Sequence, residues 1–206
     1  MKSANNVSSS SEMKRLYLTE VVTHCIREKG ISGTSMSDIC HRSNMSPGNI
    51  YRYFNGKMDM VHASLKLNFS RQIMLLPDIY AQNNPLDYIL KANFIGSNHP
   101  LHLIYDVKTV FCIEKMYYKD LARVFNRETH QLLESHLTNI VNHNNSINLK
   151  EARGMAEIVE FFITDTTMKR NSQKMKDKEM LVFYESLIDA FTCSSIMTCW
   201  LKIKRG

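Results

Sequence analysis

Polar side chains that can contact nucleic acid are concentrated in one short stretch of the sequence, residues 35–57. Arg and Asn side chains can read the edges of base pairs, Tyr hydroxyls and Lys ammonium groups can bind phosphates, and Gly lets a backbone approach a groove closely. The stretch supplies these types at Gly48, Asn49, Tyr51, Arg52, Tyr53 and Lys57. Such a set can bind DNA.

Two helix-start signals in the same stretch must position these side chains. Ser35 and Asp38 have the spacing of a capping box. Ser46 is followed by Pro47, and proline is favoured in the first turn of a helix. The two signals are close enough that only a tight turn fits between the helices that they begin. The pattern therefore predicts a helix, a short turn and a second helix.

The second of these helices is unusual because few of its residues are expected to be buried. Ile50 and Phe54 are four residues apart and share one face. The polar residues around them are then left exposed, which suits a groove in DNA. An amphipathic helix whose tyrosines cover the edge of a core is the alternative for this helix taken alone.

The pattern as a whole resembles the DNA-binding signature of the TetR family of transcriptional regulators. The matching positions are Thr34, Ser35, Asp38, Ile39, Ser46, Gly48, Ile50, Tyr51, Tyr53, Phe54 and Lys57, in roughly the first quarter of the chain. Cys40 replaces the usual small Ala, and Asn44 replaces the usual Gly of the turn. Both changes are compatible with the fold, because Cys is a small buried hydrophobe and Asn tolerates the left-handed conformation.

The resemblance implies a role for each matching residue and a mode of action. Ser37, Gly48, Asn49 and Arg52 approach bases, Ser35, Tyr51, Tyr53 and Lys57 hold phosphates, and Pro47 lies against the groove. It also implies a homodimer that pairs through its last two long helices and binds a DNA operator with two similar half-sites. A small-molecule effector inside the second domain would tilt the fourth helix and change the spacing of the two reading helices.

The charge distribution agrees with a nucleic-acid partner for the N-terminal part. The net charge is +6, and residues 13–58 hold seven Lys or Arg against three acidic residues. Residues 59–206 are nearly balanced, with eighteen against sixteen. The positive density thus coincides with the candidate DNA-binding stretch, as phosphate binding requires.

Composition also restricts the compartment and the chemistry. Five cysteines without a C-x-x-C pair indicate free thiols, and no apolar run is long enough for a membrane span or a signal peptide. We therefore expect a cytoplasmic protein that does not interact with a membrane. No nucleophile elbow, phosphate loop or set of metal ligands is present, and His99 and His102 lack a third ligand. We expect no enzyme activity, metal or cofactor.

Helical periodicity predicts an all-α fold of about nine helices in three parts. Residues 1–12, rich in Ser and Asn, are expected to be a disordered arm, 13–58 a three-helix helix-turn-helix domain, and 59–206 a helical ligand-binding and dimerisation domain. The first helix is expected over 14–29 and the fourth from residue 56 or 57 to 76, before Pro77. Later helices are expected over 85–97, 100–115, 117–143, 149–169 and 178–202.

Large side chains in the middle helices are candidates to line an effector pocket, although an ordinary core is built from the same types. They are Phe69, Tyr88, Phe94, His102, Tyr105, Phe111, Met116, Tyr117, Phe125 and Phe162. This content favours an apolar or aromatic effector. Asp106 and Glu114 could pair with a cationic ligand if they point inward, and ordinary surface charges are the alternative.

The last two predicted helices carry apolar residues on more than one face. Ile158, Phe161 and Phe162 lie beside the main stripe of residues 149–169. A helix that is apolar nearly all round must be buried nearly all round, by a second subunit or as the central helix of a monomer.

The sequence is therefore interpreted as a DNA-binding transcriptional regulator, best explained as a ligand-responsive repressor that binds a palindromic operator as a homodimer. The alternative is a non-inducible DNA-binding factor of the same fold that acts through a protein partner.

Overall fold

The computed structural model describes residues 4–82, 84–94, 100–143 and 147–172, together with Val182 and Ser186. The elements are α1 (Ala4–Gly33), α2 (Met36–Ser43), α3 (Pro47–Ile50), α4 (Lys57–Tyr80), α5 (Pro85–Phe94), α6 (Pro100–Glu114), the 3-10 helix η1 (Lys115–Tyr117), α7 (Lys119–His143) and α8 (Leu149–Ser172). The described residues contain no strand, so the all-α prediction is confirmed. The ninth predicted helix, 178–202, falls outside the described residues except at Val182 and Ser186.

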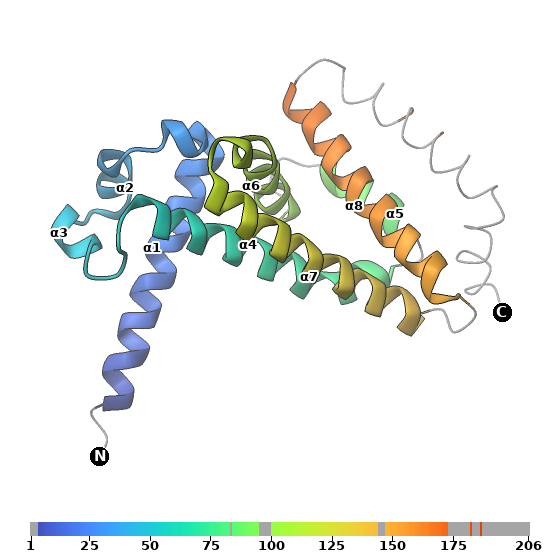
Figure 1. Ribbon diagram of the computed structural model, residues 1–206, viewed down its shortest axis with the longest axis horizontal. Coiled ribbons are helices and arrows are strands. Elements are labelled where there is room, and N and C mark those ends of the chain that lie inside the picture. The colour runs from blue at the N-terminus through green and yellow to red at the C-terminus, as the bar shows by residue number, and fades with distance from the viewer. Residues whose placement is uncertain are drawn as a thin grey trace.

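The helices form a small N-terminal group joined to a larger bundle (Figure 1). Helices α1 to α3 lie at one end, and the long helices α4 and α7 run away from them side by side. Helix α8 packs on α5, α6 and α7, while α6 also contacts α1. None of the described helices is long and apolar enough to cross a membrane.

The core of the N-terminal group consists of the residues that the periodicity predicts. The α1 stripe of Leu18, Val21, Val22, Cys25 and Ile26 is buried. Buried Ile39 from α2, Ile50 from α3 and Phe54 belong to the same core. Burial of this apolar area holds the three helices together.

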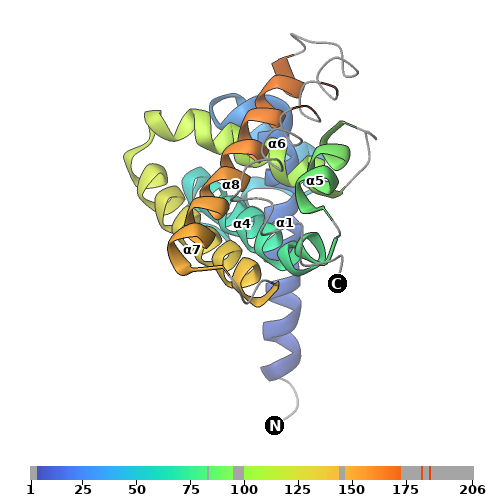
Figure 2. The same cartoon turned by 90° about the vertical axis from the view of Figure 1, so that its right-hand side faces the viewer.

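Helix α1 is longer than predicted at its N-terminus. It begins at Ala4, so the expectation of a disordered arm is wrong for residues 4–12. Ser and Asn are weak helix formers, but extending an existing helix avoids the cost of nucleation. Figure 2 shows these first turns projecting from the body of the molecule, and residues 10–17 are exposed.

Pro77 does not end α4, contrary to the prediction. The helix continues to Tyr80, and the amide of Ala81 donates to the carbonyl of Pro77 over 2.9 Å. Proline lacks the N–H that would donate to the carbonyl of Ile73, so α4 continues past Pro77 with one backbone hydrogen bond fewer. The 24 residues of α4 give a length of about 36 Å at about 1.5 Å per residue.

A carboxylate from α6 binds the point where α1 bends. Gly30 has φ 73° and ψ 175°, a conformation that is essentially confined to glycine, and α1 resumes beyond it. The amides of Ile31 and Ser32 donate to the two carboxylate oxygens of Glu114, each over 2.9 Å. The Ser32 hydroxyl also donates to Glu114 Oε2 over 2.8 Å.

Asp106, the other carboxylate considered for a cationic ligand, also contacts α1. Arg27 Nε donates to Asp106 Oδ2 over 2.8 Å, and its Nη2 lies 2.7 Å from the same oxygen. The idea that Asp106 and Glu114 face a cation inside the bundle is therefore wrong for both. They connect α6 to the N-terminal group instead, an arrangement that sequence spacing cannot reveal.

We predict that Gly30→Ala lowers the free energy of unfolding by about 1–3 kcal/mol, because alanine is strained in this conformation and its Cβ would collide with the Glu114 carboxylate. Gly48→Ala is the control, since the space around its Cβ position is open. Urea unfolding of both variants measures the difference. Equal stability of the two variants would show that the bend at Gly30 is not required.

Candidate functional site

The first helix of the helix-turn-helix is capped as predicted. The amide of Asp38 donates to Ser35 Oγ over 3.1 Å, and the amide of Ser35 donates to Asp38 Oδ2 over 2.8 Å. Lys29 also pairs with Asp38. The hydrogen bonds from Lys29 and from the Ser35 hydroxyl and amide hold the pKa of Asp38 well below its usual value. Helix α2 is thereby fixed to α1 as well as capped.

The turn between α2 and α3 depends on Asn44. It adopts the left-handed conformation, with φ 53° and ψ 38°, and is the only non-glycine residue described with a positive φ. Asn accepts this conformation more readily than most residues. The departure from glycine at this position therefore does not alter the turn.

Helix α3 is short and is completed by a turn. The amide of Asn49 lies 3.4 Å from Ser46 Oγ, and Pro47 occupies the first turn. The helix ends at Ile50, and the chain continues through a turn over 51–53, in which the amide of Tyr53 donates to the carbonyl of Ile50 over 2.9 Å. Ile50 is fully buried and Phe54 is 2% exposed, so the turn over 51–53 is anchored in the core on both sides.

The surface around α3 is composed of the residues predicted to contact DNA. Ser35, Ser37, Pro47, Gly48, Asn49, Tyr51 and Arg52 are exposed, and Tyr53 and Lys57 are partly buried. Tyr51 exposes 51% of its surface. The alternative in which the tyrosines cover a core edge therefore does not describe Tyr51, whereas Tyr53 packs partly against the core.

Arg15 supports this surface from α1 and was not found from the sequence. Its guanidinium lies 4.3 Å from the centre of the Phe54 ring and 3.6 Å from Asp59. It also donates to the carbonyl of Tyr53. Arg15 thus fixes the chain between α3 and α4. Its partners lie about forty positions away, so no local spacing could have indicated the role.

Most of the positive charge in this region is already paired. Arg15, Arg27, Lys29 and Arg42 each form an ion pair with a carboxylate. Among the described residues, no carboxylate forms an ion pair with Arg52 or Lys57. These two cations are therefore available to bind an external anion.

A second group of polar residues lies inside the bundle and is called the Glu160 cluster, consisting of Gln72, Tyr80, Lys108, His136 and Glu160. Gln72 Nε2 donates to Glu160 Oε1 over 2.9 Å, and His136 Nε2 lies 2.7 Å from the same oxygen. Lys108 pairs with Glu160 Oε2. The Tyr80 hydroxyl lies 2.8 Å from His136 Nδ1. The cluster joins α4, α6, α7 and α8.

Charge compensation keeps this cluster ionised although it is buried. Burial opposes the ionisation of Glu160, but the Lys108 charge and the His136 hydrogen bond outweigh it and lower the pKa of Glu160 to about 2. A neutral His136 satisfies both of its contacts, because Nε2–H can donate to Glu160 while Nδ1 accepts from Tyr80. Burial is also the main reason that the pKa of Tyr80 is raised.

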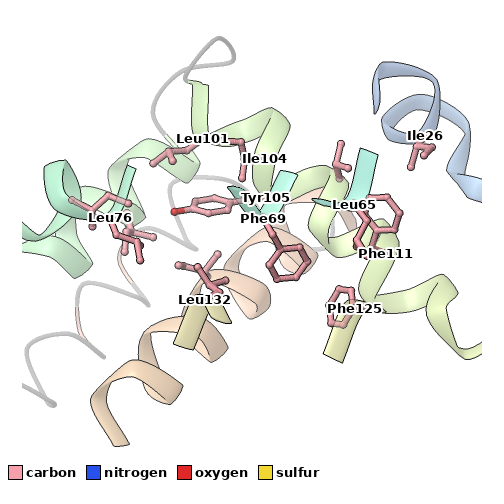
Figure 3. Close-up of a cluster of buried hydrophobic side chains, with 14 of the residues drawn as sticks. Ile26, Leu65, Phe69, Leu76, Leu101, Ile104, Tyr105, Phe111, Phe125 and Leu132 are labelled. Atoms are coloured by element: carbon pink, nitrogen blue, oxygen red, sulfur yellow. The ribbon is translucent and has the colours of Figure 1, made fainter. Parts of the chain in front are cut away.

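The residues predicted to line a ligand pocket divide into four groups. Phe69, His102, Tyr105, Phe111, Phe125 and Phe162 are buried. Figure 3 shows Phe69 between Tyr105 and Phe125, and the Phe69 and Phe125 rings meet edge to face with centres 5.3 Å apart. Tyr88 is partly buried, and the side chain of Phe94 lies outside the described residues.

Met116 and Tyr117 are incorrect members of that prediction. They are 76% and 74% exposed and lie on η1, the short surface turn between α6 and α7. A helix was expected to begin at Tyr117, but α7 begins at Lys119. Their side chains therefore point to the surface, where they cannot line a pocket within the bundle.

The sequence analysis did not predict that the polar residues of the Glu160 cluster are buried together in the bundle. Glu160 lies four residues after Ala156 and three before Ile163, on the predicted apolar face of α8, and both neighbours are buried. A carboxylate on such a face was the available signal, because a buried charge requires a partner. The identity of the partners could not be inferred, since Lys108 and His136 come from other helices.

Comparison with known proteins agrees with this geometry. Residues 19–64 match the family model described as bacterial regulatory proteins, tetR family. No curated protein matches the chain.

Similar solved structures extend the agreement to the whole described fold. One from Rhodococcus sp., assigned to the TetR family of transcriptional regulators, has a TM-score of 0.67 at 14% identity and covers 85% of this chain and 96% of its own. One from Mesorhizobium loti, with the same assignment, has a TM-score of 0.65 at 14% identity, with coverages of 88% and 96%. The transcriptional regulator FadR from Bacillus subtilis, solved with stearoyl-CoA, has a TM-score of 0.58 at 16% identity, with coverages of 84% and 95%.

The described architecture, a capped helix-turn-helix joined to an all-α bundle, is that of helix-turn-helix DNA-binding regulators. Residues 19–64 thus carry the sequence signature of the TetR family of bacterial regulators, and the described fold is similar to that of solved structures assigned to this family.

We predict that Glu160→Gln lowers the free energy of unfolding at neutral pH by about 3–5 kcal/mol, because it leaves Lys108 buried without its counter-charge. Glu160 has a folded pKa of about 2 against an ordinary value of 4.5, so its contribution is present above about pH 4.5 and is lost as the pH falls towards 2. The difference between wild type and variant should therefore shrink over that interval. Urea unfolding at several pH values measures it.

Glu157→Gln is the matched control, since Glu157 is exposed on the same helix. A loss of stability in Glu160→Gln no larger than in Glu157→Gln would contradict the role of Glu160 in joining the four helices.

Proposed function

We propose that this protein is a homodimeric transcriptional repressor that binds a palindromic DNA operator in the cytoplasm and releases it when a small molecule binds in the helical bundle. The observation that carries the proposal is the surface of α3, which exposes Asn49, Tyr51 and Arg52 while Ile50 and Phe54 anchor it in the core. A surface without core-forming residues, held on a rigid element, suits insertion into the major groove.

The proposed DNA contacts of this surface are of two kinds, contacts to base edges and contacts to phosphates. Ser37, Gly48, Asn49 and Arg52 are proposed to approach base edges, and Ser35, Tyr51, Tyr53 and Lys57 to hold phosphates, with Pro47 against the groove. Arg52 is exposed and has no carboxylate partner among the described residues, which leaves its guanidinium available for a guanine edge. Lys57 begins α4 and is proposed to bind a phosphate as a point charge.

An exposed apolar surface on α8 supports dimerisation. Phe161 is 72% exposed and Ile158 is 40% exposed, although both are large and apolar. Covering such side chains with the same surface of a second subunit would remove them from water. Two identical reading elements related by a two-fold axis would then require an operator with two similar half-sites.

The interior of the bundle supports a ligand response. Buried aromatic residues, including Phe69 and Phe125, lie near the polar Glu160 cluster, and such a mixture of apolar walls and few polar groups is typical of ligand sites. The similar fold of FadR was solved with stearoyl-CoA. We propose that a ligand here changes the positions of α4 and α6, which both contact α1. Coupling of about 1–3 kcal/mol is typical and would suffice to release an operator.

We predict that Arg52→Ala relaxes the preference for one base pair in each half-site, at a cost of about 1–3 kcal/mol in binding to the preferred sequence. Selection of bound sequences from a random DNA pool, with wild type and variant in parallel, measures the preference. Arg123→Ala, which removes an exposed arginine on α7, is the control and should leave the selected sequence unchanged. An unchanged sequence with Arg52→Ala would exclude it as a reader, and the absence of any enriched sequence with wild type would exclude the proposed function.

Lys57→Ala is expected to weaken binding to all duplexes about equally and to reduce the salt dependence of the affinity by about one phosphate contact. Fluorescence anisotropy with a labelled duplex over a range of salt concentrations measures the slope. Lys66→Ala, at an exposed position further along α4, is the control. If both variants keep the wild-type slope, Lys57 does not bind a phosphate.

A further inference from the structure

Five buried side-chain polar atoms have no hydrogen-bond partner among the described residues, and besides His62 Nε2 and Thr129 Oγ1 there are three on the packed helices α4 and α6. They are the Tyr105 hydroxyl, Gln72 Oε1 and Asn68 Oδ1. Native interiors seldom leave such atoms unpaired, because desolvation without a hydrogen bond is costly. Their occurrence together on two helices that pack against each other points to an external partner.

The three atoms lie along the contact between α4 and α6. Asn68 and Gln72 are one turn apart on α4, and Asn68 Nδ2 donates to the carbonyl of Ile104 over 2.9 Å, next to Tyr105. Figure 3 shows the Tyr105 hydroxyl pointing towards Leu76, away from Phe111 and Phe125. Gln72 lies one turn before Leu76 on α4 and donates to Glu160.

The orientation of the two amides is fixed by their other contacts. Asn68 Nδ2 donates to a backbone carbonyl and Gln72 Nε2 donates to the Glu160 carboxylate, and both of these partners only accept. The free atoms are therefore carbonyl oxygens. Each requires a donor from its partner, whereas the Tyr105 hydroxyl can donate or accept.

The electrostatics of the surroundings disfavour a charged partner, because a cation would be buried without a free counter-charge where Glu160 is already paired with Lys108, and an anion would be repelled. The Lys108 charge is compensated by Glu160, and both nitrogens of His136 are used. A carboxylate or phosphate would add a second anion beside Glu160 and would offer only acceptors to two carbonyl oxygens. Apart from the Glu160 cluster, the buried side chains labelled near Tyr105 in Figure 3 are apolar, and include Phe69, Leu76, Ile104 and Leu132.

We infer that this position, called the donor site, binds a neutral molecule with an O–H or N–H donor on an aromatic or other apolar body, such as an aromatic alcohol. The inference rests on the proposed function, since it treats the donor site as the effector site. It assigns Gln72 and Asn68 as acceptors for the ligand and Tyr105 as the group that fixes its orientation. The ligand is thus specified by its hydrogen-bond donors as well as by its apolar surface.

Three matched probes test the inference with the full chain: benzyl alcohol, benzyl methyl ether and benzoate. Ligand-observed NMR titrations give the affinity of each. Benzyl alcohol is expected to bind about tenfold more tightly than the other two, because the ether lacks a donor and benzoate is an anion. Equal binding of the ether or of benzoate would overturn the inferred ligand class.

Tyr105→Phe removes only the unpartnered hydroxyl and keeps the ring. The variant should fold with a melting temperature equal to or above that of wild type, and its preference for benzyl alcohol over the ether should decrease severalfold. Tyr117→Phe makes the same change on the exposed η1 and should keep the preference. An unchanged preference in Tyr105→Phe would overturn the role of this hydroxyl.

The test of the donor site can be distinguished from the test of the proposed function. If none of the probes binds, the three atoms are satisfied by water alone and the inference is wrong. Anisotropy with a selected DNA duplex, measured on the same preparation, independently tests DNA binding. Sequence-specific DNA binding without probe binding would reject the donor site and leave the DNA-binding function standing.

Discussion

The Glu114 carboxylate joins the bundle to α1, the helix on which the helix-turn-helix packs. It accepts the amides of Ile31 and Ser32 where α1 resumes after Gly30, so it satisfies donors that a new helical turn leaves unpaired. Because the acceptor is at the end of α6, the position of α1 depends on the position of α6. The ion pair between Arg27, which precedes the bend of α1 at Gly30, and Asp106 of α6 is a second such contact. The N-terminal group is therefore not an independent body on a flexible tether.

The helix-turn-helix is rigid for a different reason. Its core is apolar, and its polar ends are satisfied by local caps, in α2 by Ser35 and Asp38. Arg15 then binds the chain beyond α3 through Phe54 and Asp59. Under the proposed function, a movement of α1 would therefore carry α3 along as part of the whole group, without a change in its internal geometry. The exposed residues of α3 would keep their mutual positions while their distance from the proposed second subunit changed.

The sequence predicted those features whose physical causes are local. The Ser35 capping box, the proline after Ser46 and the buried stripe that includes Leu18 all depend on residues within a turn or two, and all are found. The sequence failed where a partner comes from elsewhere in the chain. Glu160 is compensated by Lys108, which lies 52 residues earlier, and no spacing rule connects the two.

Errors in helix boundaries have the same origin. Pro77 is a strong local signal for the end of a helix, but α4 continues past it. Its C-terminal residues Ile79 and Tyr80 are buried, and the Tyr80 hydroxyl contacts His136 on α7. Burial and that hydrogen bond offset the loss of one backbone donor at the proline. The tertiary contact thus decides a feature that local propensity alone would assign differently.

The two helices that surround the donor site are also the two that hold α1. On α4, the Ser64 hydroxyl lies 2.8 Å from that of Thr23, and Arg71 pairs with Glu20. On α6, Asp106 and Glu114 make the contacts described above. A molecule bound between α4 and α6, as we infer for the donor site, would alter two sets of contacts to α1 together if it separated the helices. Coupling through both helices would require no change within the helix-turn-helix. It would require only a change in the position of α1 relative to α4 and α6.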